Sequence, residues 1–343
     1  MKIAVYKDNL STGRGADRAV RNFASGLAER GHAVALMEKT EFRDRVLEAE
    51  ENAFDVIVPT GSNEIVDMSS AGYFSRPGRA KVVLQLHLAP RGFFKWKHPF
   101  RNRRIRVAFD KPDAVQLLCG EYVEDFKRLA PHPEVAVIGN YTEMSPPADH
   151  DVAAPSRSRT ILYPAAAVNK IKNQKLLIEA FSIVSGEFPD WRLRLLGKDS
   201  TSYARDCRRM IDAKGLSDRI DIVGFTNDLV GEYSRAAFIA FPSTLEGFPL
   251  AILEAANFSL ATVAQHTLPG VTDIVGDGET GLVTDGTVAA YAEGLRRMMS
   301  DADLRRRLGE NARNFCAVNY SRDKILDQWE ELLEYVRRRT AQA

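Results

Sequence analysis

The stretch MKIAVYKDNLSTGRGADRAVRNFASGLAERGHAVAL, residues 1–36, decides the fold class of this chain. Apolar, β-rich runs lie near both of its ends, at residues 3–6 and 34–36. Between them, apolar residues recur at the i, i+3, i+4, i+7 spacing that buries one face of a helix. They are Ala16, Ala19, Val20, Phe23, Ala24 and Leu27, and Gly31 closes the helix. A strand, a helix and another strand in this order predict a parallel sheet.

The same alternation continues along the chain. Further strands are expected at residues 56–58, 82–86, 115–118 and 135–138, and in the second half at 161–163, 193–196, 220–223, 238–241 and 260–263. Residues 146–159 lack either period and contain prolines and charges, which is typical of a linker. We therefore expect an α/β chain of two Rossmann-like, doubly wound domains, 1–145 and 160–318, facing each other across a cleft. Residues 319–343 are expected to form a helix that packs back on the N-terminal domain.

Length and composition agree with two globular domains. A chain of 343 residues exceeds what one hydrophobic core usually organises. Hydrophobic residues make up 45% and charged residues 27%, which excludes a disordered or fibrous chain. The formal net charge of +1 means that a polyanionic target would have to be met by a local patch. Cys119, Cys207 and Cys316 show no disulfide or zinc-ligand spacing and are expected to be reduced, buried thiols.

The sequence predicts a cytoplasmic location. Its start runs directly into the strand at residues 3–6, with no charged leader before a long apolar stretch. Its apolar runs fall far short of the roughly 20 residues that cross a bilayer. Any membrane contact is therefore expected to be peripheral, on the inner face of the cell membrane.

The most informative motif is FPSTLEGFPLAILEAAN, residues 241–257. A strand ends in a loop that carries Glu246, and Gly247 lets the backbone approach a ligand. Pro249 suits the first turn of the following helix, so the amides of Phe248 and Leu250 would be unpaired donors that favour a phosphate. Glu254 lies among apolar residues and should have a partner, for which a ribose diol is suited. The alternative is that both glutamates lie on the surface at helix ends.

This motif resembles the donor-site signature of glycosyltransferase family 4, whose members are retaining enzymes of the GT-B fold. The resemblance implies that Glu246 contacts the transferred sugar and Glu254 the nucleotide ribose. It extends to GFTNDL at 224–229, where Phe225 and Thr226 match the loop at the nucleobase, and to GDGETGLV at 276–283. Together these motifs cover most of the second domain in the family's order.

The resemblance also assigns positive charge to the donor site. Lys172 and Asn173 stand before an expected helix at 174–184, where the family's lysine neutralises the diphosphate leaving group. The family usually has an arginine five residues earlier, but this chain has Ala167 there. Lys170 or Lys172 alone is left to supply the charge. A solvated lysine at a helix start is the alternative.

Two features of the first domain complete the expected site. Gly13 and Gly15 belong to a turn between strand and helix that is not a full dinucleotide fingerprint. By resemblance this turn is the glycine loop that faces the donor phosphates and the acceptor; a plain turn is the alternative. His87 ends the strand at 82–86, and the family's histidine there hydrogen-bonds the donor sugar, although many histidines at strand ends are structural or exposed.

The segment that follows His87 is strongly basic. Residues 91–106 contain aromatic residues and seven basic residues but no acid. This pattern suits an anionic membrane or a phosphorylated glycolipid. No nucleic-acid motif accompanies it, so no nucleic-acid partner is expected; a solvated loop or an acceptor-site lid is the alternative. The residues that define this patch are Arg91, Lys95, Trp96, Lys97, Arg101, Arg103 and Arg104.

The sequence therefore predicts a retaining glycosyltransferase that moves a sugar from a nucleotide-sugar, UDP-linked, to a hydroxyl of a glycan or glycolipid acceptor. Lys172, Glu246 and His87 are its expected catalytic residues. No cofactor or metal is expected, since no Asp-x-Asp motif stands near a strand end. The alternatives are a nucleotide-sugar epimerase or phosphorylase of the same fold, or a non-catalytic protein that binds a nucleotide-sugar or an anionic surface.

Overall fold

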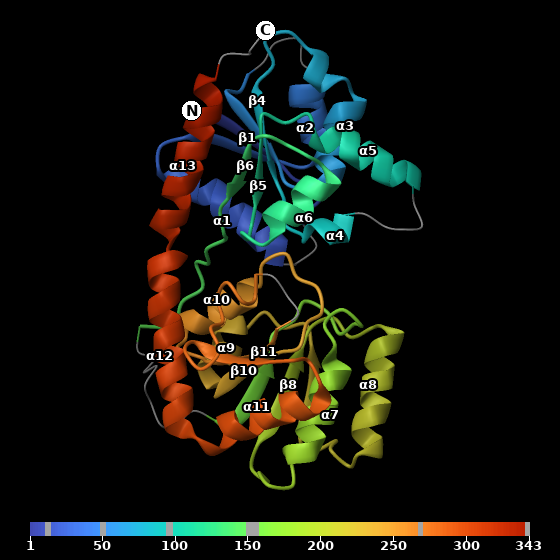
Figure 1. Ribbon diagram of the computed structural model, residues 1–343, viewed down its shortest axis with the longest axis vertical. Helices are drawn as coiled ribbons and strands as arrows, with labels where there is room; N and C mark the ends of the chain where they lie inside the picture. The colour runs from blue at the N-terminus through green and yellow to red at the C-terminus, as the bar shows by residue number, and fades with distance from the viewer. Residues whose placement is uncertain (11–14, 49–52, 94–98, 149–157, 267–269, 340–343) are drawn as a thin grey trace. The chain divides into compact units, whose positions relative to one another are not determined.

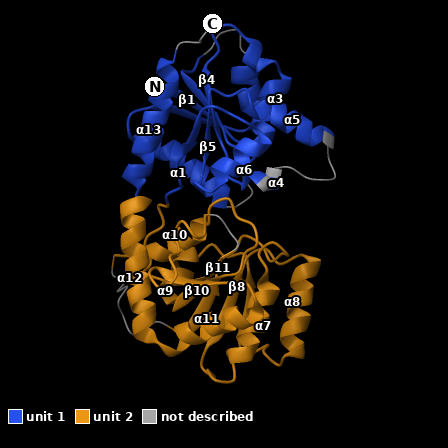
Figure 2. Cartoon of the chain, in the orientation of Figure 1, with its two compact units in different colours: residues 1–141, 321–343 blue, residues 142–320 orange. Residues whose placement is uncertain are grey.

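The structure, a computed structural model, describes residues 1–10, 15–48, 53–93, 99–148, 158–266 and 270–339. These residues form two compact units, Met1–Tyr141 with Ser321–Ala343, and Thr142–Tyr320 (Figures 1 and 2). The sequence placed its boundaries at 145, 159 and 318. The predictions for Gly13, Lys95, Trp96, Lys97 and most of the linker at 146–159 fall outside the described residues.

The first unit is built on a six-stranded parallel sheet in the order β2-β1-β3-β4-β5-β6. Ile3 of β1, the strand next to the edge strand β2, lies opposite Val34 of β2 on one side and Val56 of β3 on the other. The strands are β1 Lys2–Tyr6, β2 Ala33–Met37, β3 Val56–Pro59, β4 Lys81–Gln85, β5 Ala114–Leu117 and β6 Val135–Val137. The α-helices are α1 Gly15–Glu29, α2 Lys39–Phe42, α3 Ser62–Ser70, α4 Pro90–Phe93, α5 Pro99–Phe109, α6 Tyr122–Leu129 and α13 Arg322–Arg338.

The second unit is built on another six-stranded parallel sheet, in the order β12-β11-β10-β7-β8-β9. Its strands are β7 Thr160–Tyr163, β8 Arg192–Leu196, β9 Ile220–Gly224, β10 Phe238–Phe241, β11 Thr262–Gln265 and β12 Gly281–Thr284. Its α-helices are α7 Gln174–Val184, α8 Ser202–Ala213, α9 Leu229–Arg235, α10 Leu250–Asn257, α11 Val288–Ser300 and α12 Ala302–Asn319. The expected pair of parallel α/β domains is therefore confirmed, with all eleven predicted strands present.

Each sheet reverses its strand order once. In the first sheet β1 is followed by β2 on one side, and the chain then crosses to β3 on the other. In the second, the chain runs from β7 through β8 to β9, and then crosses back to β10 on the far side of β7. Because loops leave in opposite directions at such a switch point, a crevice opens there at the carboxyl ends of the strands.

Helix α13 belongs to the first unit although it lies at the far end of the sequence (Figure 2). Trp329 is buried against Phe23 of α1, with ring centroids 4.5 Å apart. Arg30, which follows α1, forms ion pairs with three carboxylates of α13. They are Asp323 at 3.0 Å, Asp327 at 2.5 Å and Glu330 at 2.8 Å. The first unit is thus completed by a segment that follows the second unit in sequence.

One strand was not predicted. Residues 281–284 form β12, which pairs with β11 in parallel, whereas sequence reasoning treated 276–283 only as a family motif. The first residue of the strand has to be glycine, because a Cβ at position 281 would lie 2.5 Å from the carbonyl oxygen of Thr262. Glycine has a low β propensity, so a run of four residues that opens with glycine is hard to recognise as a strand from sequence. Pairing with β11 stabilises this segment as a strand.

Candidate active site

Two predicted residues meet at the switch point of the second sheet. Lys172 follows β7 and Glu246 follows β10, and these strands are neighbours. The Nζ atom of Lys172 lies 2.5 Å from Oε1 of Glu246. The hydroxyl of Ser243 donates to the same oxygen at 2.5 Å. The structure thus brings together the two expected catalytic residues of this unit and adds Ser243, which sequence reasoning missed.

The loops that carry this pair are joined to each other by a backbone hydrogen bond, and the Lys172 carbonyl is held by a side chain of β7. The amide of Thr244 donates to the carbonyl of Ile171 at 2.8 Å. The Tyr163 hydroxyl donates to the carbonyl of Lys172 at 2.8 Å. Burial, together with the nearby Glu246 carboxylate, raises the pKa of Tyr163 well above its usual value, so the hydroxyl keeps its proton and stays a donor.

The residue after Lys172 turns the chain into helix α7. Asn173 adopts a left-handed conformation with φ of 53°, which asparagine tolerates better than most residues. It is the N-cap of α7, and the preceding amide of Lys172 is held by the Oδ1 atom of Asn169 at 3.0 Å. Lys172 thus lies in the turn directly before the N-cap of the helix.

The ion pair is neither fully buried nor freely solvated. The side chains of Lys172 and Glu246 are 21% and 13% exposed. An ammonium has three N–H donors and a carboxylate can accept several hydrogen bonds, so each group can bind a further partner. A paired cation and anion at this point can hold a diphosphate and a sugar hydroxyl side by side.

Glu254 is buried and hydrogen-bonded. Its residue exposure is 1%, and the hydroxyl of Tyr233 donates to its Oε2 atom at 2.8 Å. Tyr233 stacks on Phe258, with ring centroids 5.3 Å apart. The interpretation of both glutamates as surface residues is therefore wrong. Tyr233 was missed because it lies on α9, far from the motif in sequence.

The start of helix α10 differs from the prediction. The amide of Leu250 donates to the carbonyl of Phe248 at 2.9 Å, so it is not an unpaired donor. Pro249 is the N-cap residue of the helix, not its first turn. Because proline fixes φ but cannot donate, the chain closes a tight turn around it and this turn takes up the Leu250 amide. Gly247 and Phe248 are buried next to this turn, where the Phe248 ring contacts Tyr320.

The expected nucleobase loop leaves β9 through a glycine in the left-handed region. Gly224 has φ of +82°, a conformation open to glycine, and Phe225 is 58% exposed. The Thr226 hydroxyl accepts from the amide of Asp228 at 3.0 Å, and the Asp228 carboxylate caps helix α9. The loop therefore holds an exposed aromatic ring on a rigid turn.

The position that lacks the expected arginine has a neighbouring lysine. Ala167 pairs with Lys198 in an isolated parallel bridge, just after β8 ends. This approach requires glycine at 197, since a Cβ there would lie 2.5 Å from the carbonyl oxygen of Ala165. The side chains of Lys170 and Lys198 are both exposed. Lys198 was missed, although its place directly after a parallel strand was a usable signal.

His87 and Lys7 lie at the carboxyl edge of the first sheet. Both ring nitrogens of His87 are buried, and neither has a hydrogen-bond partner among the residues that the structure describes. Burial, aided by the charge of Lys7, lowers the pKa of His87 to about 3, so the ring is neutral near pH 7. Lys7 itself lies 3.5 Å from the buried Glu64 carboxylate. Gly15, the described part of the glycine loop, begins α1.

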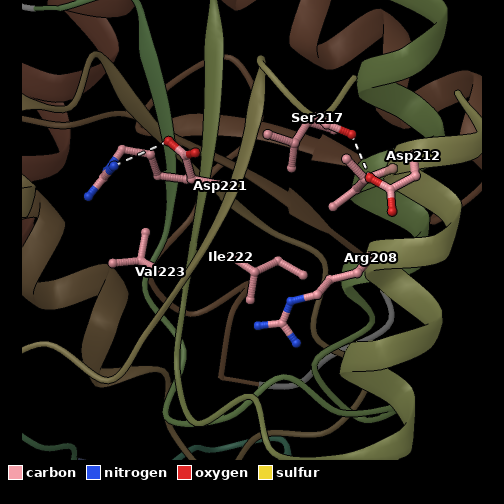
Figure 3. Close-up of a pocket in the computed structure, with 9 residues that line it drawn as sticks. Arg208, Asp212, Ser217, Asp221, Ile222 and Val223 are labelled. Atoms are coloured by element: carbon pink, nitrogen blue, oxygen red, sulfur yellow. Dashed lines mark hydrogen bonds and ion pairs between the residues drawn. The ribbon is translucent and has the colours of Figure 1, made fainter. Parts of the chain in front are cut away.

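A hollow of about 450 Å³ lies elsewhere in the second unit, between α8 and the edge strand β9 (Figure 3). Its lining includes Arg194, Arg208 and Asp221, but none of the predicted site residues. Arg194 is paired with Glu232 at 2.8 Å and Arg208 with Asp199. The hollow adjoins the edge strand β9 and not the switch point between β7 and β10, so it is separate from the site of Lys172 and Glu246.

Two further structural findings concern metals and membranes. Across the described ranges, no three His, Cys, Asp or Glu side chains are grouped so as to hold a metal ion. In the same part of the chain, no helix is both long and apolar enough to cross a membrane. Cys119, Cys207 and Cys316 are buried, as expected, and none of them forms a disulfide with another described residue.

Comparison with known sequences identifies the second unit. Residues 147–315 match the family described as glycosyl transferases group 1. The chain is 35% identical over 184 residues to an exopolysaccharide phosphotransferase of Streptomyces coelicolor, covering 53% of this chain and 19% of the relative. It is 25% identical over 248 residues to a poly(glycerol-phosphate) alpha-glucosyltransferase of Bacillus subtilis, covering 71% of this chain and 36% of the relative. For the first three relatives found, the part that this chain matches is 19% to 44% of the relative's own length.

The fold matches a solved structure over nearly its whole length. Anabaena HepE in complex with UDP-glucose superposes with a TM-score of 0.82, covering 98% of this chain and 100% of that protein, at 17% identity. At this identity the likeness concerns the fold, which is that of the GT-B glycosyltransferases. Through residues 147–315 the second unit therefore belongs to the group 1 glycosyltransferases, and both sheets have the GT-B fold.

Proposed function

We propose that this chain is a retaining glycosyltransferase that moves a sugar from a UDP-linked donor to a hydroxyl of a glycan or glycolipid. The observation that carries the proposal is the contact between Lys172 and Glu246 at the switch point of the second sheet. Such points are where doubly wound sheets bind nucleotides. Glu254, buried on the helix that follows Glu246, adds a carboxylate suited to a ribose diol.

The related proteins favour this donor and acceptor chemistry. HepE was solved with UDP-glucose, and the Bacillus relative is named as a glucosyltransferase that acts on poly(glycerol-phosphate). The Streptomyces relative is named as an exopolysaccharide phosphotransferase, which bears on the acceptor class and not on the donor. A cell-envelope polysaccharide or its lipid-linked precursor is therefore the acceptor class that we propose, with the protein acting in the cytoplasm or at the inner face of the membrane.

In the proposed reaction the bond between the sugar anomeric carbon and the donor phosphate oxygen breaks. The acceptor hydroxyl oxygen forms the new bond to that carbon, and its proton passes to the departing phosphate. Lys172 stabilises the charge that develops on the diphosphate, assisted by Lys198 or Lys170, and Glu246 orients the sugar. In this proposal Phe225 and Thr226 contact the nucleobase of the donor, and Glu254 contacts its ribose. His87 contacts the sugar that is transferred. No metal ion or cofactor takes part.

The decisive experiment measures release of nucleoside diphosphate from UDP-, GDP- and ADP-sugars, with and without polysaccharide or lipid-linked acceptor. Glu246→Gln keeps the side-chain shape but removes the charge that pairs with Lys172. We expect it to lower kcat/KM about 10- to 100-fold, the range of a hydrogen bond to a charged group. Glu310→Gln, at an exposed glutamate of α12, is the matched control and should leave turnover unchanged.

The same assay separates the alternatives. Release of diphosphate that depends on the acceptor supports transfer, whereas product formation without any acceptor indicates an epimerase, and dependence on inorganic phosphate indicates a phosphorylase. A protein that binds the donor but gives no turnover under any condition would be a binding protein. Loss of turnover on adding a chelator would contradict the metal-free mechanism.

A further inference from the structure

Helix α5 presents a narrow apolar stripe to solvent. Phe100 and Val107 are 86% and 52% exposed and lie seven residues apart. Arg103 and Arg104 stand between them, and both are exposed. The i, i+3, i+4, i+7 spacing places these four side chains on one face, with the apolar pair in the middle and an arginine on each side.

The opposite face of α5 fixes this orientation. Ile105, Ala108 and Phe109 are buried, and the Phe109 ring packs on Phe126 of α6 with centroids 5.7 Å apart. Turning the helix to hide Phe100 would therefore expose three core residues. Phe100 and Val107 are therefore exposed because the buried residues of α5 fix the rotation of the helix, and not because the end of the helix is frayed.

A hollow of about 340 Å³ adjoins the stripe, between α5 and α3. Its lining contains apolar groups, hydroxyls and two guanidinium groups, but no carboxylate. Arg104 is held over α3 by a hydrogen bond from its Nη2 atom to the hydroxyl of Ser70 at 3.0 Å. The residues that line it are Val66, Ser69, Ser70, Phe100, Arg103, Arg104 and Val107.

We infer that this α5 face, formed by Phe100, Arg103, Arg104 and Val107, binds the surface of an anionic phospholipid bilayer. The apolar pair enters the acyl boundary, while the two arginines contact lipid phosphates on either side. This inference rests on the proposed function, because it gives the enzyme access to a lipid-linked acceptor. It assigns the membrane contact to four described side chains and not to the basic segment as a whole.

The chemistry of the face favours a bilayer over a macromolecular partner. Stable protein interfaces bury about 1,200–2,000 Å² in total, whereas this stripe is one helix face wide. A nucleic acid would meet the arginines, but its phosphates would then surround two exposed apolar side chains that gain nothing from them. A fluid anionic surface satisfies both kinds of side chain at once.

The test is flotation of the full chain with phosphatidylcholine vesicles, with and without phosphatidylglycerol. The wild type should partition to the anionic vesicles and be released by salt. Arg103→Gln with Arg104→Gln should lower partition about fivefold per arginine, which corresponds to about 1 kcal/mol each. Phe100→Ser with Val107→Ser should lower it about tenfold or more, through lost apolar burial. Thermal unfolding checks that each variant is folded.

Matched controls come from the second unit. Val318→Ser replaces an exposed apolar residue, and Arg209→Gln with Arg306→Gln removes two exposed charges; these variants should float like the wild type. Equal partition of the wild type to neutral and anionic vesicles, or unchanged flotation of the Phe100/Val107 variant, would overturn the inference. The inference would also be overturned if the wild type did not bind vesicles and the α5 variants instead lost the ability to dimerise or to bind nucleic acid. Because flotation needs no donor, its outcome is independent of whether transfer occurs.

Discussion

At the scale of single residues, the site depends on side chains that hold the functional groups in place. Tyr233 positions Glu254, Ser243 positions Glu246, and Asn173 turns the chain so that Lys172 can reach across. These partners matter because a carboxylate in a partly buried place is costly unless its oxygens are hydrogen-bonded. Each gives a local prediction.

Tyr233→Phe should impair the donor site through Glu254. The substitution removes the hydrogen bond that the Tyr233 hydroxyl donates to the buried Glu254 carboxylate, which costs about 1–3 kcal/mol of unfolding free energy. We expect the KM for the nucleotide-sugar and the Kd for UDP to rise while kcat changes less. Calorimetric titration of UDP measures this. Tyr335→Phe, at an exposed hydroxyl on α13, should change neither constant; a normal UDP affinity in Tyr233→Phe would refute the positioning role.

His87 should make stability depend on pH. Its pKa is lowered to about 3 in the folded protein by burial and by Lys7, while the unfolded value is near 6.5. Between these values the unfolded chain binds more protons, so stability is fully present above about pH 6.5 and is lost as pH falls toward 3. Chemical unfolding at a series of pH values should show a shallower loss for His87→Gln than for the wild type. Parallel curves would mean that the ring titrates normally.

At the scale of elements, glycines decide how closely helices and loops approach their neighbours. Gly197 lets the loop after β8 lie against residues 165–167, and Gly309 lets helix α12 pack on the chain after α10. In both places a methyl group would meet backbone, which cannot rotate aside.

Gly309→Ala separates helix propensity from packing. Propensity alone predicts that alanine in the middle of α12 stabilises the protein by about 1 kcal/mol. However, the added Cβ would overlap the carbonyl oxygen of Ser259. We therefore expect a net loss of about 1–3 kcal/mol, as for other overpacked sites. Unfolding in urea measures the sign. Gly186→Ala, where a Cβ meets nothing within 4 Å, is the control and should not destabilise the protein; a stabilised Gly309→Ala would show that the helix can shift.

At the scale of the whole molecule, the chain returns to its first unit after completing the second. Helix α13 covers α1 through Trp329 and holds Arg30 with three carboxylates. The first unit therefore needs both ends of the described chain.

Trp329→Ala should weaken the first unit selectively. Replacing a buried tryptophan with alanine costs about 3–5 kcal/mol. Amide hydrogen exchange should become faster in α1 and β4, while α7 and β8 in the second unit keep their protection. Tyr335→Ala, at an exposed position of the same helix, should leave exchange in α1 unchanged. Uniform acceleration in both units would show that they unfold as one.

The sequence by itself determined the periodic features: eleven strands, helices such as α7, and the pairing of two parallel α/β domains. These features follow from burial patterns within a few neighbouring residues, whereas the roles expected of Glu246 and Glu254 rest on the family resemblance of residues 241–257. Only the tertiary structure decided which groups meet. Ser243, Tyr233 and Lys198 come from other loops and helices, the Leu250 amide closes a local turn, and β12 exists because β11 pairs with it. The physical reason is that these contacts join segments through the strand order of the sheet, which no local period records.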